Sequence, residues 1–236
     1  MSLRALSRSP AAFSTAVLAF FLAILTADRY VDLRGQLLLG LATWVVLLAA
    51  LRPLPTDRRL QTLLVIVAAT CMEVVGSIIW GVYTYRLHNL PLFVPPGHGL
   101  VYLSGMRLSE TRLAAGNRRV FITAVAVCAA GWALAGLTFL PQRDVSGAIG
   151  TAVFLVFLLR GRVPAVYAGV FCIVGCLELA GTASGVWRWH ELVPGLQLPS
   201  GNPPSGAASG YVLFDIVAIG LSARLLLALR PAASPA

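Results

Sequence analysis

The chain has 236 residues, of which 58% are hydrophobic and 11% are charged. A soluble domain needs more polar surface than this to cover itself, so the composition excludes an ordinary soluble protein. The formal charge of +9 suggests a nucleic-acid partner, but the basic residues are all Arg and lie almost entirely in short loops, so no nucleic-acid partner is predicted.

Taken in chain order, eight apolar runs have about the length that crosses a hydrocarbon core of roughly 30 Å. They lie near residues 11–27, 35–51, 60–84, 92–107, 120–140, 145–160, 164–187 and 205–228. The sequence therefore predicts an all-α, polytopic membrane helical bundle of about eight transmembrane helices. Pro95 and Pro96 interrupt the fourth run, which predicts either a short helix that begins at the proline pair or a partly re-entrant segment.

The arginines predict the orientation of these spans. Eight crossings place both termini on one side, where 13 of the 18 Arg residues then collect, including Arg4, Arg8 and Arg230 near the chain ends. Basic loop residues accumulate on the cytoplasmic side, so both termini are predicted to be cytoplasmic. The bias towards Arg, Ala, Leu and Gly is typical of a bacterial source, which places the protein in the inner (cytoplasmic) membrane.

The third and seventh runs carry the same motifs in the same order. A Cys-x-Glu-x-x-Gly element contains Glu73 in the first copy and Glu178 in the second, an offset of 105 residues. A Gly-x-aromatic-x-aromatic element and a Pro-Pro pair follow in each copy. The sequence thus predicts two parallel four-helix repeats, residues 1–118 and 119–236. The aromatic residues of the second element are Tyr83, Tyr85, Trp187 and Trp189.

Three carboxyl groups lie inside the apolar runs, namely Glu73, Glu178 and Asp215. Each costs about 2.5–3.5 kcal/mol to insert when charged, and such residues usually mark a functional site. His98 begins the fourth run and Asn202 precedes the second proline pair, so the whole set is predicted to line one cavity. A structural alternative is that the two Glu side chains bind backbone N–H groups near the proline pairs, and that His98 is a satisfied residue at a helix start.

The predicted catalytic residues are Glu73, Glu178, Asp215 and His98. The predicted substrate-binding residues are Tyr83, Tyr85, Trp187, Trp189 and Asn202. Anchoring at the membrane interface explains the four aromatic residues equally well, since Tyr and Trp favour that position near helix ends. No His-x-Glu or Cys-x-x-Cys spacing is present, so no metal site is predicted. The chain has no Lys for a retinal Schiff base, and no cofactor is predicted.

The string Glu73-x-x-Gly76, Gly81-x-Tyr83-x-Tyr85, with a later Pro95, resembles a pattern in membrane-bound carotenoid-biosynthesis proteins of the bisanhydrobacterioruberin hydratase type. The two motif copies cover about a fifth of the chain. The second copy departs from this pattern in its Trp pair, and it resembles uncharacterised bacterial membrane proteins. The resemblance implies an isoprenoid or carotenoid-type lipid as substrate, and hydration or cyclisation as the reaction.

Such a reaction begins when an acid protonates an unactivated alkene, and aromatic faces then stabilise the carbocation. Glu73 and Glu178 are the candidate acids, because a desolvated carboxyl group can keep its proton at neutral pH. Asp215 and His98 are candidates to position water or to take up the released proton. A proton-coupled transporter or channel for a small solute or lipid is the main alternative, with the two Glu residues as titrating groups. A non-catalytic membrane subunit is a third possible function. A homo-oligomer or a membrane partner protein is compatible with each of these three functions.

Overall fold

The computed structural model describes residues 9–228, and this part of the chain is mostly helical. Eight of its helices have 16 residues or more, and each overlaps one of the predicted apolar runs. They are α2 (Pro10–Asp28), α3 (Leu33–Leu51), α4 (Thr56–Glu73), α5 (Val94–Ser109), α7 (Arg118–Thr138), α8 (Val145–Arg160), α9 (Pro164–Ser184) and α10 (Ala207–Ala228). A π-helix, η1 (Val74–Ile79), continues α4, and a short helix, α6 (Arg112–Gly116), links α5 to α7. Arg4, Arg8 and Arg230 lie outside the described residues.

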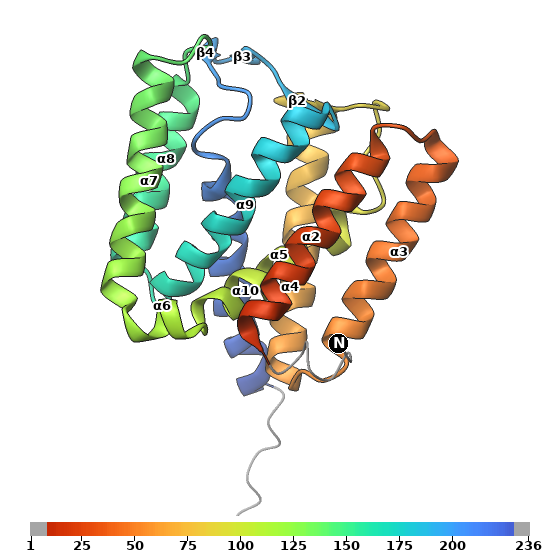
Figure 1. The fold of residues 1–236 in the computed structure, drawn as a ribbon, viewed down its shortest axis with the longest axis vertical. Helices are drawn as coiled ribbons and strands as arrows, with labels where there is room; N and C mark the ends of the chain where they lie inside the picture. Colours follow the sequence, from red (N-terminus) through yellow and green to blue (C-terminus); the bar gives the residue numbers. More distant parts are fainter. Residues whose placement is uncertain (1–8, 229–236) are drawn as a thin grey trace, which may run out of the picture.

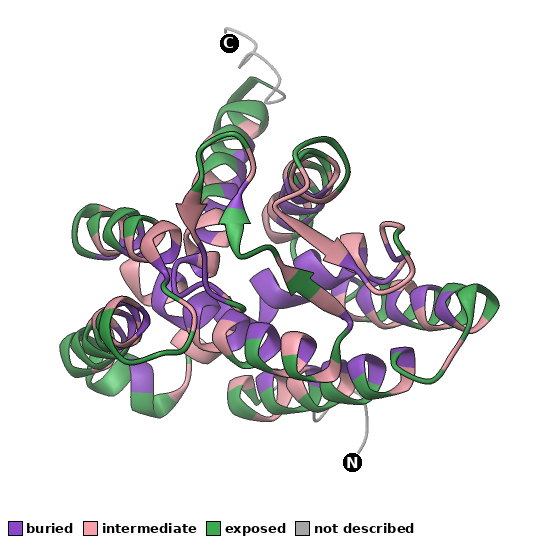
Figure 2. Ribbon diagram, turned by 90° about the horizontal axis from the view of Figure 1, so that it is seen from above, coloured by how far each residue is buried: buried purple, intermediate pink, exposed green. Residues whose placement is uncertain are grey.

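Six of these helices are long and apolar enough to cross a membrane. The other two, α5 and α8, have 16 residues each and so measure about 24 Å, which is shorter than a hydrocarbon core of about 30 Å. Many large apolar side chains are exposed on the bundle. The buried residues gather around its middle (Figure 2). An apolar outer surface of this extent is typical of a protein surrounded by lipid.

The long helices run alternately up and down the bundle (Figure 1). The described part of α2 begins and that of α10 ends at the same end of the bundle, which we call the termini end. The opposite end, which we call the hairpin end, carries the connection from η1 to α5 and the connection from α9 to α10. These two connections contain the strands of the structure.

Four helices form the centre of the bundle. α5 packs against α9, α10 packs against α4, and the pairs α4–α5 and α9–α10 complete the ring. The helices α2 and α3 lie on one side of this core, and α7 and α8 lie on the other (Figure 1). Gly105 of α5 and Gly169 of α9 face each other so closely that a Cβ atom on either residue would meet the backbone of the other helix. Small residues at this crossing therefore set the spacing of the core.

Two predictions about the helix ends need correction. The third and seventh spans were expected to continue to residues 84 and 187, but the helices end at Ile79 and Ser184. Shortly after each end a glycine adopts the left-handed conformation, Gly81 with φ of 70° and Gly185 with φ of 72°, and this conformation terminates helices. The fourth helix begins at Val94, with a proline in its first turn, as the first of the two alternatives for that segment predicted.

The chain beyond these glycines forms short strands that an all-α prediction does not include. β1 (Tyr83–Tyr85) pairs with β2 (Trp187–Trp189) in antiparallel register, and β3 (Leu192–Val193) pairs with β4 (Leu198–Pro199). Tyr83 lies opposite Trp189, and Tyr85 lies opposite Trp187. The two Gly-x-aromatic-x-aromatic elements, which are 104 residues apart at their glycines, thus pair with each other across the hairpin end.

Candidate functional site

The aromatic strands fold back over the helices that precede them. The N–H of Val82 donates to the carbonyl of Gly76 at 2.8 Å, and the N–H of Val186 donates to the carbonyl of Gly181 at 2.9 Å. At both positions the missing side chain leaves room for an aromatic ring, that of Tyr83 over Gly76 and that of Trp187 over Gly181. The glycine of each Cys-x-Glu-x-x-Gly element therefore lets the aromatic side chains reach the Glu of the same element.

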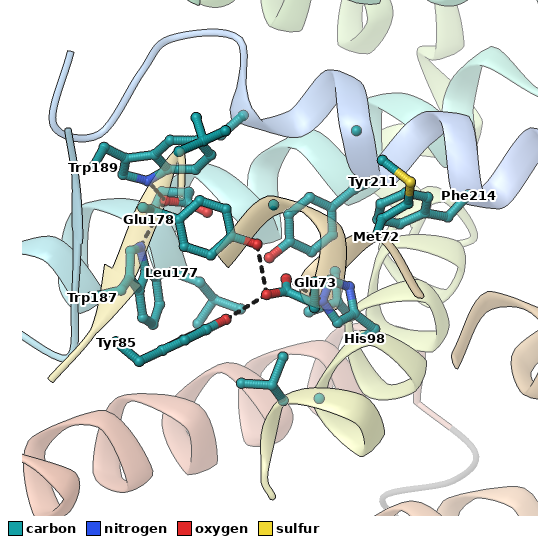
Figure 3. A pocket seen from close by; sticks show the side chains of 18 of the residues that line it. Met72, Glu73, Tyr85, His98, Leu177, Glu178, Trp187, Trp189, Tyr211 and Phe214 are labelled. Atoms are coloured by element: carbon teal, nitrogen blue, oxygen red, sulfur yellow. Dashed lines mark hydrogen bonds and ion pairs between the residues drawn. The ribbon is translucent and has the colours of Figure 1, made fainter. Parts of the chain in front are cut away.

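Glu73, the last residue of α4, is held by three side chains (Figure 3). The hydroxyls of Tyr83 and Tyr85 both donate to its Oε2 at 2.7 Å. Nε2 of His98 lies 2.9 Å from Oε1, close enough for a hydrogen bond or an ion pair. Burial raises the pKa of both tyrosine hydroxyls, which lie beyond the end of the helix, so they act as neutral donors. Two hydroxyl donors and an adjacent imidazole nitrogen thus surround Glu73, and this environment favours its carboxylate form.

Glu178 occupies the matching position on α9, but its partners differ. The indole Nε1 atoms of Trp187 and Trp189 both donate to Oε2 at 3.0 Å. Among the described residues no basic side chain forms an ion pair with Glu178, and none donates to its Oε1. An indole N–H can only donate, so Oε2 must be the unprotonated oxygen, and any proton on this carboxyl group is carried by Oε1.

The two carboxyl groups face one cavity of about 270 Å³ between the core helices and the paired strands (Figure 3). Its lining is almost entirely apolar or aromatic, with contributions from α2, α4, η1, α5, α9, α10 and both aromatic strands. Met72 and Val75 line the cavity and are also 47% and 37% exposed, so the cavity reaches the apolar outer surface beside α4. A molecule that dissolves in lipid can therefore approach the carboxyl groups from the side.

His98 has two aromatic neighbours that the sequence analysis did not select. The ring of Tyr211 stacks on the imidazole with centroids 4.7 Å apart, and the ring of Phe214 meets it edge-on at 5.9 Å. Both residues belong to α10 and line the cavity. The sequence does contain a signal for Tyr211, because this residue lies one helical turn before Asp215 and so shares its face of the helix.

Two of the predicted site residues do not line the cavity. Asp215 is buried below it in the core, one turn further along α10 than Tyr211. The side chain of Asn202 accepts a hydrogen bond from the backbone N–H of Trp189 at 3.0 Å, so it supports β2 from outside the cavity. The structure thus brings together Glu73, Glu178, His98 and the four strand aromatics, but not Asp215 or Asn202. In the described part of the chain, no cluster of three His, Cys, Asp or Glu residues is placed to hold a metal ion.

Comparison of the chain with protein-family models, with curated proteins and with solved structures gave no match. The cavity brings together the carboxyl group of Glu178, which has no basic partner among the described residues, and the Glu73–His98 pair within one apolar chamber.

Proposed function

We propose that this chain is an intramembrane enzyme that protonates an alkene of an isoprenoid or carotenoid-type lipid, and so starts its hydration or cyclisation. The observation that carries the proposal is the environment of Glu178. This carboxyl group is 4% exposed, has no basic partner among the described residues, and opens on an apolar cavity lined by aromatic rings. Burial in such a place favours the protonated acid, which is the form that donates to an alkene.

In the first step, Glu178 gives its proton from Oε1 to one alkene carbon. The π electron pair forms the new C–H bond, and the neighbouring carbon becomes a cation. The indole N–H groups of Trp187 and Trp189 then stabilise the carboxylate that remains on Glu178. The rings of Tyr83 and Trp189, with centroids 4.6 Å apart, offer π faces to the cation, each worth about 0.5–2 kcal/mol.

In the second step, the carboxylate–imidazole pair of Glu73 and His98 accepts a proton. For hydration, a water oxygen forms the C–O bond to the cation and loses a proton to this pair. For cyclisation, a second alkene of the substrate forms the C–C bond, and the proton leaves from the adjacent carbon. Both routes use a base that is distinct from the acid, and the two Glu residues have different partners. The catalytic cycle closes when the pair gives up one proton and one proton returns to Glu178 through water in the cavity.

The proposal includes the membrane arrangement. We propose eight crossings, with α5 and α8 as the short ones, in two parallel four-helix repeats of residues 1–118 and 119–236. Both termini are then cytoplasmic, in the bacterial inner membrane. Support comes from the alternating helices and from the pairing of the matched elements in β1 and β2. A lipid substrate enters beside Met72 and Val75, so no soluble domain is needed to deliver it.

The test uses the full chain in lipid nanodiscs with an acyclic carotenoid such as lycopene as the first probe. Extracted lipid is analysed by mass spectrometry for the addition of water or for an isomer, and in heavy water the protonated carbon gains deuterium. We expect Glu178→Gln to slow turnover by about 10²–10⁴-fold, which is the usual contribution of a general acid. Glu73→Gln removes the base and slows turnover as well.

Glu191→Gln is the matched control, because this carboxyl group lies on the exposed surface at the hairpin end. It should leave turnover unchanged. Unchanged turnover in both Glu73→Gln and Glu178→Gln would contradict the proposal. Uptake into proteoliposomes that collapses with the proton gradient, without chemical change of any lipid, would instead identify a transporter. Neither activity, together with co-purification of an enzyme, would identify a non-catalytic subunit.

A further inference from the structure

Below the cavity, polar side chains continue along the axis of the four-helix core. His98 and Tyr102 lie one turn apart on α5, and Tyr211 and Asp215 lie one turn apart on α10. Residues four apart share one face of a helix, so each pair presents two successive levels to the core. At the upper level the rings of His98 and Tyr211 stack across the axis, although α5 and α10 occupy opposite corners of the ring of helices.

The lower level takes polar residues from three of the core helices. The hydroxyl of Tyr102 on α5 donates to Oε1 of Gln61 on α4 at 2.9 Å. The carboxyl group of Asp215 on α10 is close enough to Tyr102 to act on its hydroxyl electrostatically. We call this polar level the Asp215 layer, formed by Gln61, Tyr102 and Asp215.

Two buried atoms on these levels have no hydrogen-bond partner. Among the described residues, Nδ1 of His98 and Oδ2 of Asp215 are fully enclosed and make no hydrogen bond. The two residues are 4% and 2% exposed. A buried polar atom without a partner is costly, and ordered water is the usual way in which proteins satisfy it. Both atoms therefore require a small polar partner, such as water, on the axis of the four-helix core.

The charged groups around the Asp215 layer lie towards the termini end. Arg58 and Asp57, in the first turn of α4, act electrostatically on Tyr102. Gln61 and Arg58 are only partly buried, so the layer lies one or two turns of α4 from water at that end. At the other end of the axis, His98 lines the cavity and its Nδ1 is enclosed.

We propose that a file of water molecules along this axis connects Asp215 with His98 and relays protons between the cavity and the termini end. The inference rests on the proposed function, because it supplies the route by which the carboxylate–imidazole pair regains its starting state. When that pair has taken a proton from the substrate, the imidazolium releases a proton from Nδ1 to the nearest water. The N–H bond breaks and an O–H bond forms. The last water then passes a proton to Oδ2 of the Asp215 carboxyl group, which releases its own proton from Oδ1 towards the termini end.

Hydroxyl-radical footprinting of the full chain in nanodiscs tests the water file. Tyr102 and Phe154 are each 1% exposed, so Phe154, which stacks on Phe171 away from the file, is the matched control. We expect Tyr102 to be labelled about tenfold faster than Phe154, because bound water generates radicals next to the ring. Equal labelling of the two rings would overturn the proposal.

Asp215→Leu fills the same space with an apolar group. We expect it to reduce the labelling of Tyr102 to the level of Phe154, whereas Asp215→Asn, which keeps a polar group, should retain most of it. The experiment is repeated with sodium replaced by choline. Labelling that changes with this replacement would show a bound cation on the axis instead of water, and would also overturn the proposal.

Proton relay is measured on the histidine itself. The chain has only three His residues, so the imidazole N–H signal of His98 can be assigned in NMR spectra by its loss in His98→Gln. We expect this N–H to exchange with solvent several-fold more slowly in Asp215→Leu than in the wild-type protein. An unchanged exchange rate would show that protons reach His98 by another route. Neither measurement requires turnover, so failure of the relay is distinguished from failure of the proposed enzyme.

Discussion

The surroundings of Glu73 and Glu178 share a backbone design but differ in their side chains. In both, a glycine with positive φ turns the chain, a strand folds back, and two aromatic side chains donate to one carboxyl oxygen. Around Glu73 the donors are hydroxyls and a His is added, whereas around Glu178 the donors are indoles. A hydroxyl or an imidazole can also accept a proton, but an indole N–H cannot. The first region can therefore pass protons on, and the second can release one only into the cavity.

The largest expected difference concerns the loss of a partner. His98→Leu leaves the Glu73 carboxyl group without its imidazole partner, and the loss of a hydrogen bond to a buried charged group costs about 1.5–3 kcal/mol of unfolding free energy. Glu178→Gln should cost less than about 1 kcal/mol, because the amide oxygen still accepts both indole N–H groups. Both variants are compared with the wild-type protein by denaturant unfolding in detergent.

A double variant separates the pair from general packing. In Glu73→Gln/His98→Leu no buried charge remains, so the double variant should be more stable than His98→Leu alone. If Glu178→Gln proved as destabilising as His98→Leu, the two regions would not differ in the way described.

The two glycines under the aromatic rings give an intermediate effect. In Gly181→Ala the new methyl group collides with the Trp187 ring, whereas in Gly76→Ala it lies 3.2 Å from the nearest atom of the Tyr83 ring. We expect Gly181→Ala to lower the unfolding free energy by about 1–3 kcal/mol, which is typical of overpacking, and Gly76→Ala to have a smaller effect. The melting temperatures of both variants and of Gly116→Ala, where nothing lies within 4 Å of the new group, measure this. A larger loss of unfolding free energy in Gly76→Ala than in Gly181→Ala would contradict the closer packing of the aromatic ring over Gly181.

Much of the fold was accessible from the sequence, because apolar runs and proline positions determine where helices form in a membrane protein. Each of the eight runs overlaps one of the long helices, and the fourth helix begins at its proline pair. The ends of η1 and α9 were placed too late, since an apolar run does not show that Gly81 and Gly185 take the left-handed conformation that ends a helix. Without that turn, the pairing of β1 with β2 could not be expected.

The composition of the site was predicted only in part. The matched elements indicated that Glu73 and Glu178 lie at equivalent depth, and His98 was placed near them by its position at a helix start. Asp215 was assigned to the same cavity because sequence gives depth along a helix but not the direction that the side chain faces. Tyr211 was missed for the same reason, since its contact with His98 joins helices more than 100 residues apart in the chain.

The two regions are also expected to differ in alkaline sensitivity, an effect that is absent at neutral pH. The pKa values of Tyr83 and Tyr85 are raised by burial in the folded protein, so above about pH 10 these tyrosines ionise more readily in the unfolded chain. Their contribution to stability is thus fully present below that pH and is lost above it, by up to about 1.4 kcal/mol per pH unit for each tyrosine. Unfolding measured between neutral and alkaline pH should show a shallower loss in Tyr83→Phe/Tyr85→Phe than in the wild-type protein. Trp187→Phe should keep the wild-type slope of unfolding free energy against pH, because an indole does not titrate in this range. An equal change of slope in both variants would show that the alkaline response does not belong to the Glu73 region.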